Sequence, residues 1–408
     1  AGTKLAGEEL YELYRAYWGS DSYADDMVVA ALDGTGIYAG ADDVVREEIA
    51  SKTAAYSVTW MYVIHEMEDA INDCNEGDIT SNDDAVHAWD EAWVFYSGTL
   101  EGSSEEGNRD GVLAYRLAEK RCANFGTCNG DDDGDATTGK SLVNDQLLSL
   151  YKQGMHALED GKCNSAEVIL RAIVKQMTVP LIQGTLRYAY KADPNGGADT
   201  PASKQQAEGW AFTSAVLPQI DACDAGVASM IRANMEYGVA SPVADGYAAV
   251  YAEMQKVYSC LGITCADVGG YVASVTDGTI TYVSGTEPCD DSLPSAPVGP
   301  QNGAGYGVYA GYAAGSDVIQ HARIDLDHQE FNTHLENGDW ASAKTIYQNG
   351  KYSMKSSGLR TIAGFSTDAG TKLAGEELYE LYRAYWGSDS YADDMVVAAL
   401  DGTGIYAG

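Results

Sequence analysis

Several features that define common functional classes are absent from the 408-residue sequence or scarce in it. Basic residues number 25 against 61 acids, and a surface with a net charge of -36 repels nucleic acid and anionic membranes but attracts cations. No apolar run approaches the roughly 18 residues that a membrane span needs. The GxSxG and HExxH patterns and the Rossmann fingerprint are missing too. We therefore expect no nucleic-acid binding, no membrane span and no enzymatic activity.

The cysteine pattern lacks any CxxC pair, which argues against zinc. The count is even, at 8, and favours disulfides in an oxidising compartment, either extracellular or periplasmic. Two short loops, Cys122–Cys128 and Cys260–Cys265, are predicted to be closed by local disulfides. The sequence leaves open the partners of the remaining four cysteines, Cys74, Cys163, Cys223 and Cys289.

The first 40 residues recur letter for letter at the other end of the chain. Residues 1–40 and 369–408 are identical, charged positions included, whereas a functional constraint would let surface positions drift. The identity indicates near-identical units laid end to end, and an artificial join is the alternative. We expect a unit to begin near Ser316, to pass through residue 408, which is equivalent to residue 40, and to continue from 41 to about 283. The chain is then a window on a longer array.

Most of each unit is predicted to be helical. Within 7–17, Leu10, Leu13, Tyr14 and Tyr17 form one apolar stripe at the helical period. The other expected helices are 43–73, 83–98, 110–123, 141–160, 164–190, 203–217, 223–237, 244–260, 316–337 and 339–348.

One segment, 271–283, has a different pattern. Two β-rich runs meet there at Asp277-Gly278, which predicts a hairpin. Residues 284–315, rich in Gly, Pro and Ser, are interpreted as a linker. The expected organisation is therefore the end of one helical region (1–40), a helical-bundle core with a C-terminal hairpin (41–283), the linker, and the start of the next unit (316–408).

Residues 91–100 and 208–217 show a weaker internal similarity, an echo of one segment in the other at a constant offset of 117. Two related helical sub-bundles, or chance similarity between two apolar helices, would both produce it. The fold class that we predict is mainly α, a helical bundle with one small β-hairpin, repeated in tandem.

Two of the predicted helices carry nearly the same polar signature among apolar residues. In each, an imidazole is followed three and four residues later by two carboxylates, so the three groups share one helix face. If the helices lie antiparallel with these faces inward, their donors converge, as in the metal sites of helical bundles. The candidate metal ligands, which include the counterpart of Glu91 in the echo, are His65, Glu68, Asp69, His87, Asp90, Glu91 and Glu208.

Carboxylate-rich ligand sets with few histidines suit hard cations, and ferric iron also accepts tyrosine phenolate oxygen. Four tyrosines are available for this purpose, Tyr62, Tyr96, Tyr188 and Tyr190. The alternative is that some of these polar groups face solvent.

A second candidate cation site is the loop Asn129, Asp131, Asp133 and Asp135, which resembles the first half of a calcium loop. Lys140 stands where the bidentate glutamate of such a loop belongs. A solvated acidic turn is the alternative.

Long motifs in a fixed order resemble a known family. They are WMYVIHEMEDAINDC, AVHAWDEAWVFYSGTLEG, KRCANFGTC, VPLIQGTLRYAYKADP, AEGWAFTSAVLP and YSCLGITC. Together they resemble the algal low-iron-inducible periplasmic proteins, a family that includes the iron-assimilation proteins of green algae and the phytotransferrins of diatoms. The resemblance extends from about Asp325, round through the repeat, to Cys265. His65-x-x-Glu68 is also similar to the His-x-x-Glu of imelysin-like bundles.

The family resemblance implies an extracellular, mostly helical protein of ferric iron uptake, with carbonate as a synergistic anion. Arg187 or Arg121 would anchor the carbonate, or would neutralise the acids as a salt bridge. The array of near-identical units departs from the family and indicates a fibre or surface coat, in which the partners are other units of the same chain and neighbouring chains. We therefore expect a secreted tandem-repeat protein that binds ferric iron or another hard cation. A purely structural filament without metal is the alternative.

Overall fold

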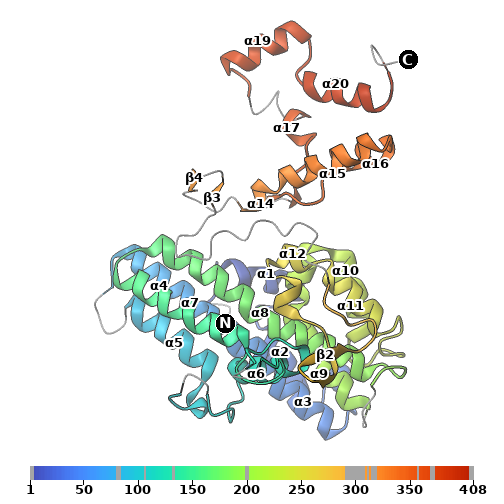
Figure 1. Ribbon diagram of the computed structural model, residues 1–408. Helices are drawn as coiled ribbons and strands as arrows, with labels where there is room; N and C mark the ends of the chain where they lie inside the picture. The colour runs from blue at the N-terminus through green and yellow to red at the C-terminus, as the bar shows by residue number, and fades with distance from the viewer. Residues whose placement is uncertain are drawn as a thin grey trace. The chain divides into compact units, whose positions relative to one another are not determined.

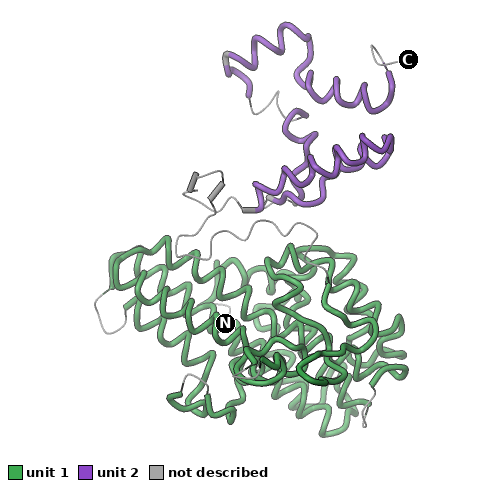
Figure 2. Tube along the Cα trace, viewed as in Figure 1, with its two compact units in different colours: residues 1–295 green, residues 296–408 purple. Residues whose placement is uncertain are grey.

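The computed structural model describes residues 4–79, 84–104, 107–130, 134–197, 202–289, 308–309, 312–313, 319–355, 358–367 and 373–403. The chain divides into two compact units, residues 1–295 and 296–408 (Figure 2). Helices dominate both units, so the predicted mainly α class is confirmed (Figure 1). Among the described residues, no helix is both long enough and apolar enough to cross a membrane.

The helices expected in the first unit from apolar periodicity are present, and α2 is an addition. The expected helix 43–73 is built from α3, a π-helical stretch η2 (Ala54–Thr59) and α4. The first unit contains α1 (Glu9–Trp18), α2 (Tyr23–Asp33), α3 (Asp43–Thr53), α4 (Trp60–Glu76), α5 (Ala85–Ser97), α6 (Ala114–Phe125), α7 (Leu142–Glu159), α8 (Cys163–Ala192), α9 (Ala202–Cys223), α10 (Ala225–Met235), α11 (Tyr247–Gln255), α12 (Tyr258–Leu261) and α13 (Cys265–Val268).

The longest helix, α8, lies at the centre of the first unit. With α4, α5 and α7 it forms one bundle, and on another side it packs against α9, which also contacts α3, α10 and α1 (Figure 1). Its second half is buried on nearly all sides from Met177 to Ala192, as expected for a helix without a polar face. Side chains of α8 and α9 therefore meet in the interior, where water is excluded.

The predicted hairpin is present as β1 (Val272–Thr276) and β2 (Thr279–Tyr282). Asp277 and Gly278 connect the strands with φ of 50° and 73°. Positive φ at both central residues is what a type I′ turn requires, and Asp-Gly suits it.

Four disulfides fasten helix ends and loops in the first unit: Cys74–Cys163, Cys122–Cys128, Cys223–Cys260 and Cys265–Cys289. The Cys122–Cys128 prediction is confirmed. The predicted Cys260–Cys265 bridge is wrong, because these cysteines belong to separate short helices. Cys260 on α12 bonds to the last residue of α9, and Cys265 on α13 bonds to Cys289, which follows the hairpin.

The second unit contains α14 (Ile319–Ala322), α15 (Ile324–Glu336), α16 (Trp340–Asn349), α17 (Gly364–Thr367), α19 (Glu377–Trp386) and α20 (Tyr391–Leu400), with the paired strands β3 (Val308–Tyr309), β4 (Tyr312–Ala313), β5 (Met354–Lys355) and β6 (Gly358–Leu359). Its core gathers Ala343, Tyr347, Ala363 and Leu400, so α20 is held against α16 and α17. Most of the expected linker, 284–315, lies outside the described residues.

Candidate functional site

Helices α4 and α5 pack side by side, but no hydrogen bond or ion pair joins their two polar signatures among the described residues. His65 Nδ1 contacts Glu8 Oε1, from the segment that precedes α1. His87 belongs to the first turn of α5, where its Nε2 lies 3.6 Å from Glu91 Oε1 and both side chains are exposed. Burial raises the pKa of Glu66, on α4, and the charge of Glu91 adds to that rise. Among the described residues, no three His, Cys, Asp or Glu side chains are grouped as a metal would require.

His65 is instead paired with Glu8, and the charge of Glu8 also acts on the half-buried Glu68. The hydrogen bond to Glu8 raises the pKa of His65 above its usual value. Burial, and then the charges of Glu8 and Glu9, raise the pKa of Glu68 to about 7. The pair of His65 with Glu8 ties the N-terminal segment to α4. Asp69 and Asp90 lie on exposed positions of their helices.

Other predicted residues do meet, around a stack of three aromatic rings. The Phe212 ring of α9 lies between the rings of Tyr56 and Tyr188, with centroid distances of 5.2 and 5.7 Å. Tyr56 comes from η2, and π-helical turns are frequent at functional sites. Gly184 on α8 permits this approach, because a Cβ there would lie 2.6 Å from the Phe212 ring.

Two arginines cover this stack. The guanidinium carbon of Arg187 lies 4.8 Å from the Tyr188 ring centroid, and that of Arg121, on α6, lies 6.0 Å from the Phe212 centroid. Arg121 Nη1 donates to Asn124 Oδ1 at 3.0 Å. The Nε atoms of both arginines are buried and have no hydrogen-bond partner among the residues that the structure describes.

The charges around the arginines are mostly positive. Burial, and then the charge of Arg187, lower the pKa of Arg121. Burial, followed by the charges of Arg116, Lys52 and Arg121, likewise lowers the pKa of Lys120. In a chain with 61 acids and 25 bases, such a local excess of cations is an exception. An unpaired buried cation is unfavourable, so the arrangement favours an anion that can bridge the guanidinium groups.

Oxygen ligands lie beside these cations. Burial raises the pKa of the Glu208 carboxyl, while the hydrogen bond from the Tyr188 phenol opposes that rise. Lys52 Nζ is 4.0 Å from Glu208 Oε1 but 2.9 Å from Glu48 Oε2, so Lys52 pairs more closely with Glu48 than with Glu208. Burial raises the pKa of Tyr56 to about 12, and the charge of Arg121 acts against that rise. Two phenols and a carboxyl thus adjoin two arginines, a donor set that suits a hard cation bound together with an anion.

The remaining predicted phenols have other contacts. Tyr96 is buried and donates to Asn144 Oδ1 at 2.6 Å. Tyr190 packs edge-on against Tyr247, and the Tyr62 hydroxyl accepts from Lys4. Of the four predicted tyrosines, Tyr188 lies at the arginines. Tyr56 was not predicted, because no local sequence signal marks it.

The proposed calcium loop is only partly described, since Asp131 and Asp133 lie outside the described residues. Asn129 Oδ1 accepts from the backbone N–H of Lys140 at 3.1 Å. Asp135 Oδ1 accepts from the backbone N–H and the hydroxyl of Thr137. These two oxygens therefore stabilise the turn itself.

Residues 134–141, GDATTGKS, also fit the letters of a phosphate-binding loop, and α7 follows them directly. Ser141 N donates to Glu119 Oε1 at 3.1 Å, and Lys140 Nζ lies 2.9 Å from Asp145 Oδ1. The Ser141 N–H and the Lys140 ammonium, which would bind a phosphate in such a loop, are thus already paired with carboxylates of the protein.

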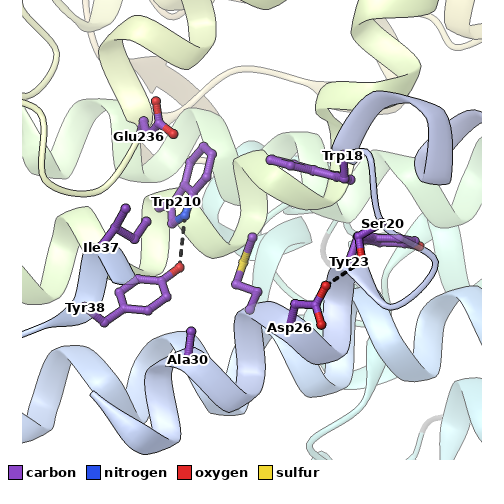
Figure 3. A pocket seen from close by; sticks show the side chains of 10 residues that line it. Trp18, Ser20, Tyr23, Asp26, Ala30, Ile37, Tyr38, Trp210 and Glu236 are labelled. Atoms are coloured by element: carbon purple, nitrogen blue, oxygen red, sulfur yellow. Dashed lines mark hydrogen bonds between the residues drawn. The ribbon is translucent and has the colours of Figure 1, made fainter. Parts of the chain in front are cut away.

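A pocket of about 280 Å³ lies between α2 and α9 (Figure 3). Trp18, Tyr23 and Met27 are among its lining residues. Trp210 Nε1, also in the lining, donates to Tyr38 Oη at 3.2 Å. Its lining is mostly apolar, and its only carboxylates are Asp26 and Glu236.

Comparison with known proteins identified one family. The family model described as "Low iron-inducible periplasmic protein" matches residues 2–291 and 301–407. No curated protein and no solved structure matches the chain.

Proposed function

The chain belongs to the low iron-inducible periplasmic protein family, and from this premise we propose that it binds ferric iron together with a small oxyanion beside Arg121 and Arg187. Family membership makes it a periplasmic or secreted protein of iron assimilation, and its four disulfides fit that location. In this proposal iron is the ion that the protein carries, and the anion coordinates the iron together with the protein.

The observation that carries the proposal is the pair of buried, unpartnered Nε atoms of Arg121 and Arg187. A planar oxyanion such as carbonate presents several acceptors in one plane, which matches the fixed donor geometry of guanidinium groups. The same anion would offer oxygen to a cation held by Tyr188 and Glu208. Of the seven predicted metal ligands, the proposal keeps Glu208, while His65 and Glu68 take the structural role described above.

A ferric titration with and without bicarbonate tests this proposal. The parent chain should bind iron with a visible phenolate-to-iron absorption band, and binding should depend on bicarbonate. Arg187→Gln should weaken binding about 10- to 100-fold, because a charge-assisted hydrogen bond is lost. Arg171→Gln is the matched control, since Arg171 lies on the same helix in an exposed pair with Glu167.

Tyr188→Phe should remove or shift the absorption band while the helical signal is retained. Binding that is independent of bicarbonate, or that is equal in Arg187→Gln and Arg171→Gln, would refute the site.

The second part of the proposal is that units follow one another in a tandem array that assembles into an extracellular fibre or coat. The identity of residues 1–40 and 369–408 supports it. A purely structural filament remains the competing function, and the use of His65 to hold the N-terminal segment favours it. Elemental analysis of native material separates the two, because a structural filament should contain no stoichiometric metal.

A further inference from the structure

The two identical segments fold in the same way. We call their described parts, residues 4–40 and 373–403, the first arm and the second arm. Helix α1 (Glu9–Trp18) corresponds residue for residue to α19 (Glu377–Trp386). Tyr11 Oη donates to the carbonyl of Asp21 at 2.8 Å, and Tyr379 Oη donates to that of Asp389 at 2.9 Å. Each arm is therefore preformed, whatever surrounds it.

The first arm is covered on one face by the rest of its own unit, residues 41–289, which we call the body. Tyr14 is 1% exposed, and its hydroxyl donates to the Ala215 carbonyl at 2.6 Å. The Gln219 amide donates to the same hydroxyl at 2.8 Å. Trp18 packs edge-on against Trp210, beside the pocket in Figure 3. We define the body face of the first arm as Leu10, Tyr14, Tyr17 and Trp18, which pack in or against the core, together with the half-buried Leu13 beside them.

The same face of the second arm is exposed. Tyr382, the counterpart of Tyr14, is 46% exposed, although its helix has the same conformation. The other counterparts in this face are exposed too: Leu378, Leu381, Tyr385 and Trp386. Five large apolar side chains side by side on one short helix are characteristic of an interaction surface.

A different face shows the reverse pattern. Leu32 is 60% exposed in the first arm, whereas its counterpart Leu400 is 8% exposed and packs in the core of the second unit. Asp393 accepts from the Tyr347 hydroxyl at 2.8 Å, while its counterpart Asp25 is exposed. We call this the forward face, and its members in the first arm are Asp25, Val29, Leu32 and Asp33.

The two faces share no residue, so one arm can be covered on both at once. Among the described residues, each arm is covered on only one of these two faces. Because the sequences are identical, the surface that covers the body face of the first arm fits the second arm equally well.

We infer that the second arm docks through its body face onto the body of a second copy of this unit, in the place that the first arm occupies on its own body. This inference rests on the proposed end-to-end assembly and names the surface that performs it. A preformed arm loses little conformational entropy on docking. The first arm competes for the same place and has the advantage of a high effective concentration.

The test weakens that competitor in the full chain. Tyr14→Asp puts a charge into the buried contact of the first arm and leaves the second arm unchanged. The variant should form head-to-tail oligomers that grow with protein concentration, measured by light scattering, whereas Tyr14→Asp/Tyr382→Asp should remain monomeric. Glu8→Lys is a second way to release the first arm, through repulsion of His65, and avoids the risk that Tyr14→Asp misfolds the body.

Hydrogen exchange gives an independent readout. Both substitutions change the mass of peptides from the first arm, so the otherwise identical arms can be followed separately. The peptide containing Tyr382 should become protected as oligomers form.

Oligomers that persist equally when Tyr382 is also replaced would overturn the docking surface but leave the assembly proposal intact. Monomers with a protected Tyr382 peptide would overturn the second copy as the partner. Monomers with an unprotected peptide would overturn the inference altogether, and none of these results bears on iron binding.

Discussion

Gly184 on α8 lies so close to the Phe212 ring on α9 that a Cβ would come within 2.6 Å of it. Gly184→Ala should therefore lower the free energy of unfolding by about 1–3 kcal/mol through overpacking, and should disturb the ring stack beneath the arginines. Chemical denaturation measures the effect. The control is Gly226→Ala, where the nearest atom is the Asp224 carboxylate oxygen at 3.1 Å, so little change is expected. Equal stability of the two variants would contradict the contact.

The Glu8–His65 pair predicts how stability depends on pH. The folded-state pKa of His65 is raised by Glu8, so its contribution is complete below the unfolded pKa of about 6.5 and is lost as pH rises through the folded value. Glu68 acts in the same direction, because its pKa of about 7 in the fold exceeds its ordinary value of 4.5. The melting temperature should therefore fall between about pH 4.5 and pH 7 because of Glu68, and His65 should continue the fall above about pH 6.5.

The double variant His65→Gln/Glu68→Gln should flatten this pH dependence over the same range. A parent chain whose melting temperature rises over that range, or a double variant with the parent's slope, would contradict the assignment.

The buried charge of Arg121 is expected to lower the stability of the anion-free chain while it contributes to anion binding. Arg121→Met removes an unpaired buried charge, so the free energy of unfolding without added anion should rise by about 1 kcal/mol or more. Stabilisation by bicarbonate and ferric iron should disappear in the same variant. Arg171→Met, in an exposed ion pair, should change stability by less than about 0.5 kcal/mol. Destabilisation of the anion-free chain by Arg121→Met would show that this charge is satisfied.

The forward face predicts opposite outcomes for two identical substitutions. Leu400→Asp places a charge in the core of the second unit and should destabilise that unit by about 2–4 kcal/mol. Leu32→Asp changes an exposed position and should have almost no effect on the monomer. Exchange of the α16 amides, whose sequence is unique in the chain, reports on the second unit. Equal effects of the two substitutions would mean that the arms have equivalent environments.

Local patterns predicted much of the fold. The apolar stripe of residues 7–17 and the Asp277-Gly278 turn are short-range signals, and both elements are present. The partner of Cys260 depends on where α12 lies relative to the end of α9, and no local signal encodes that placement. Helix α2 was missed because its apolar residues do not form a single stripe: Ala24 and Ala31 are buried, whereas Val29 and Leu32 are exposed.

The candidate site depended still more on long-range contacts. The arginines, Glu208 and Tyr188 were named from the sequence as parts of a site centred on His65 and His87, but Tyr56 was not named. They come from η2, α6, α8 and α9, and the packing of Phe212 against Gly184 brings the elements together. The His-x-x-acid pattern gave no indication of Glu8, because the contact of His65 with Glu8 joins residues 57 positions apart in sequence.

The disulfides limit how far the protein can be stretched. Cys74 and Cys163 are 89 residues apart in sequence, and Cys223 and Cys260 are 37 apart. When the ends of the first unit are pulled, the chain between bridged cysteines cannot lengthen, even if its helices unravel. At about 3.4 Å per extended residue, the Cys74–Cys163 disulfide alone prevents about 300 Å of extension. A thread made of such units would resist tension as short, stiff segments, and a reducing agent would turn it into an extensible one.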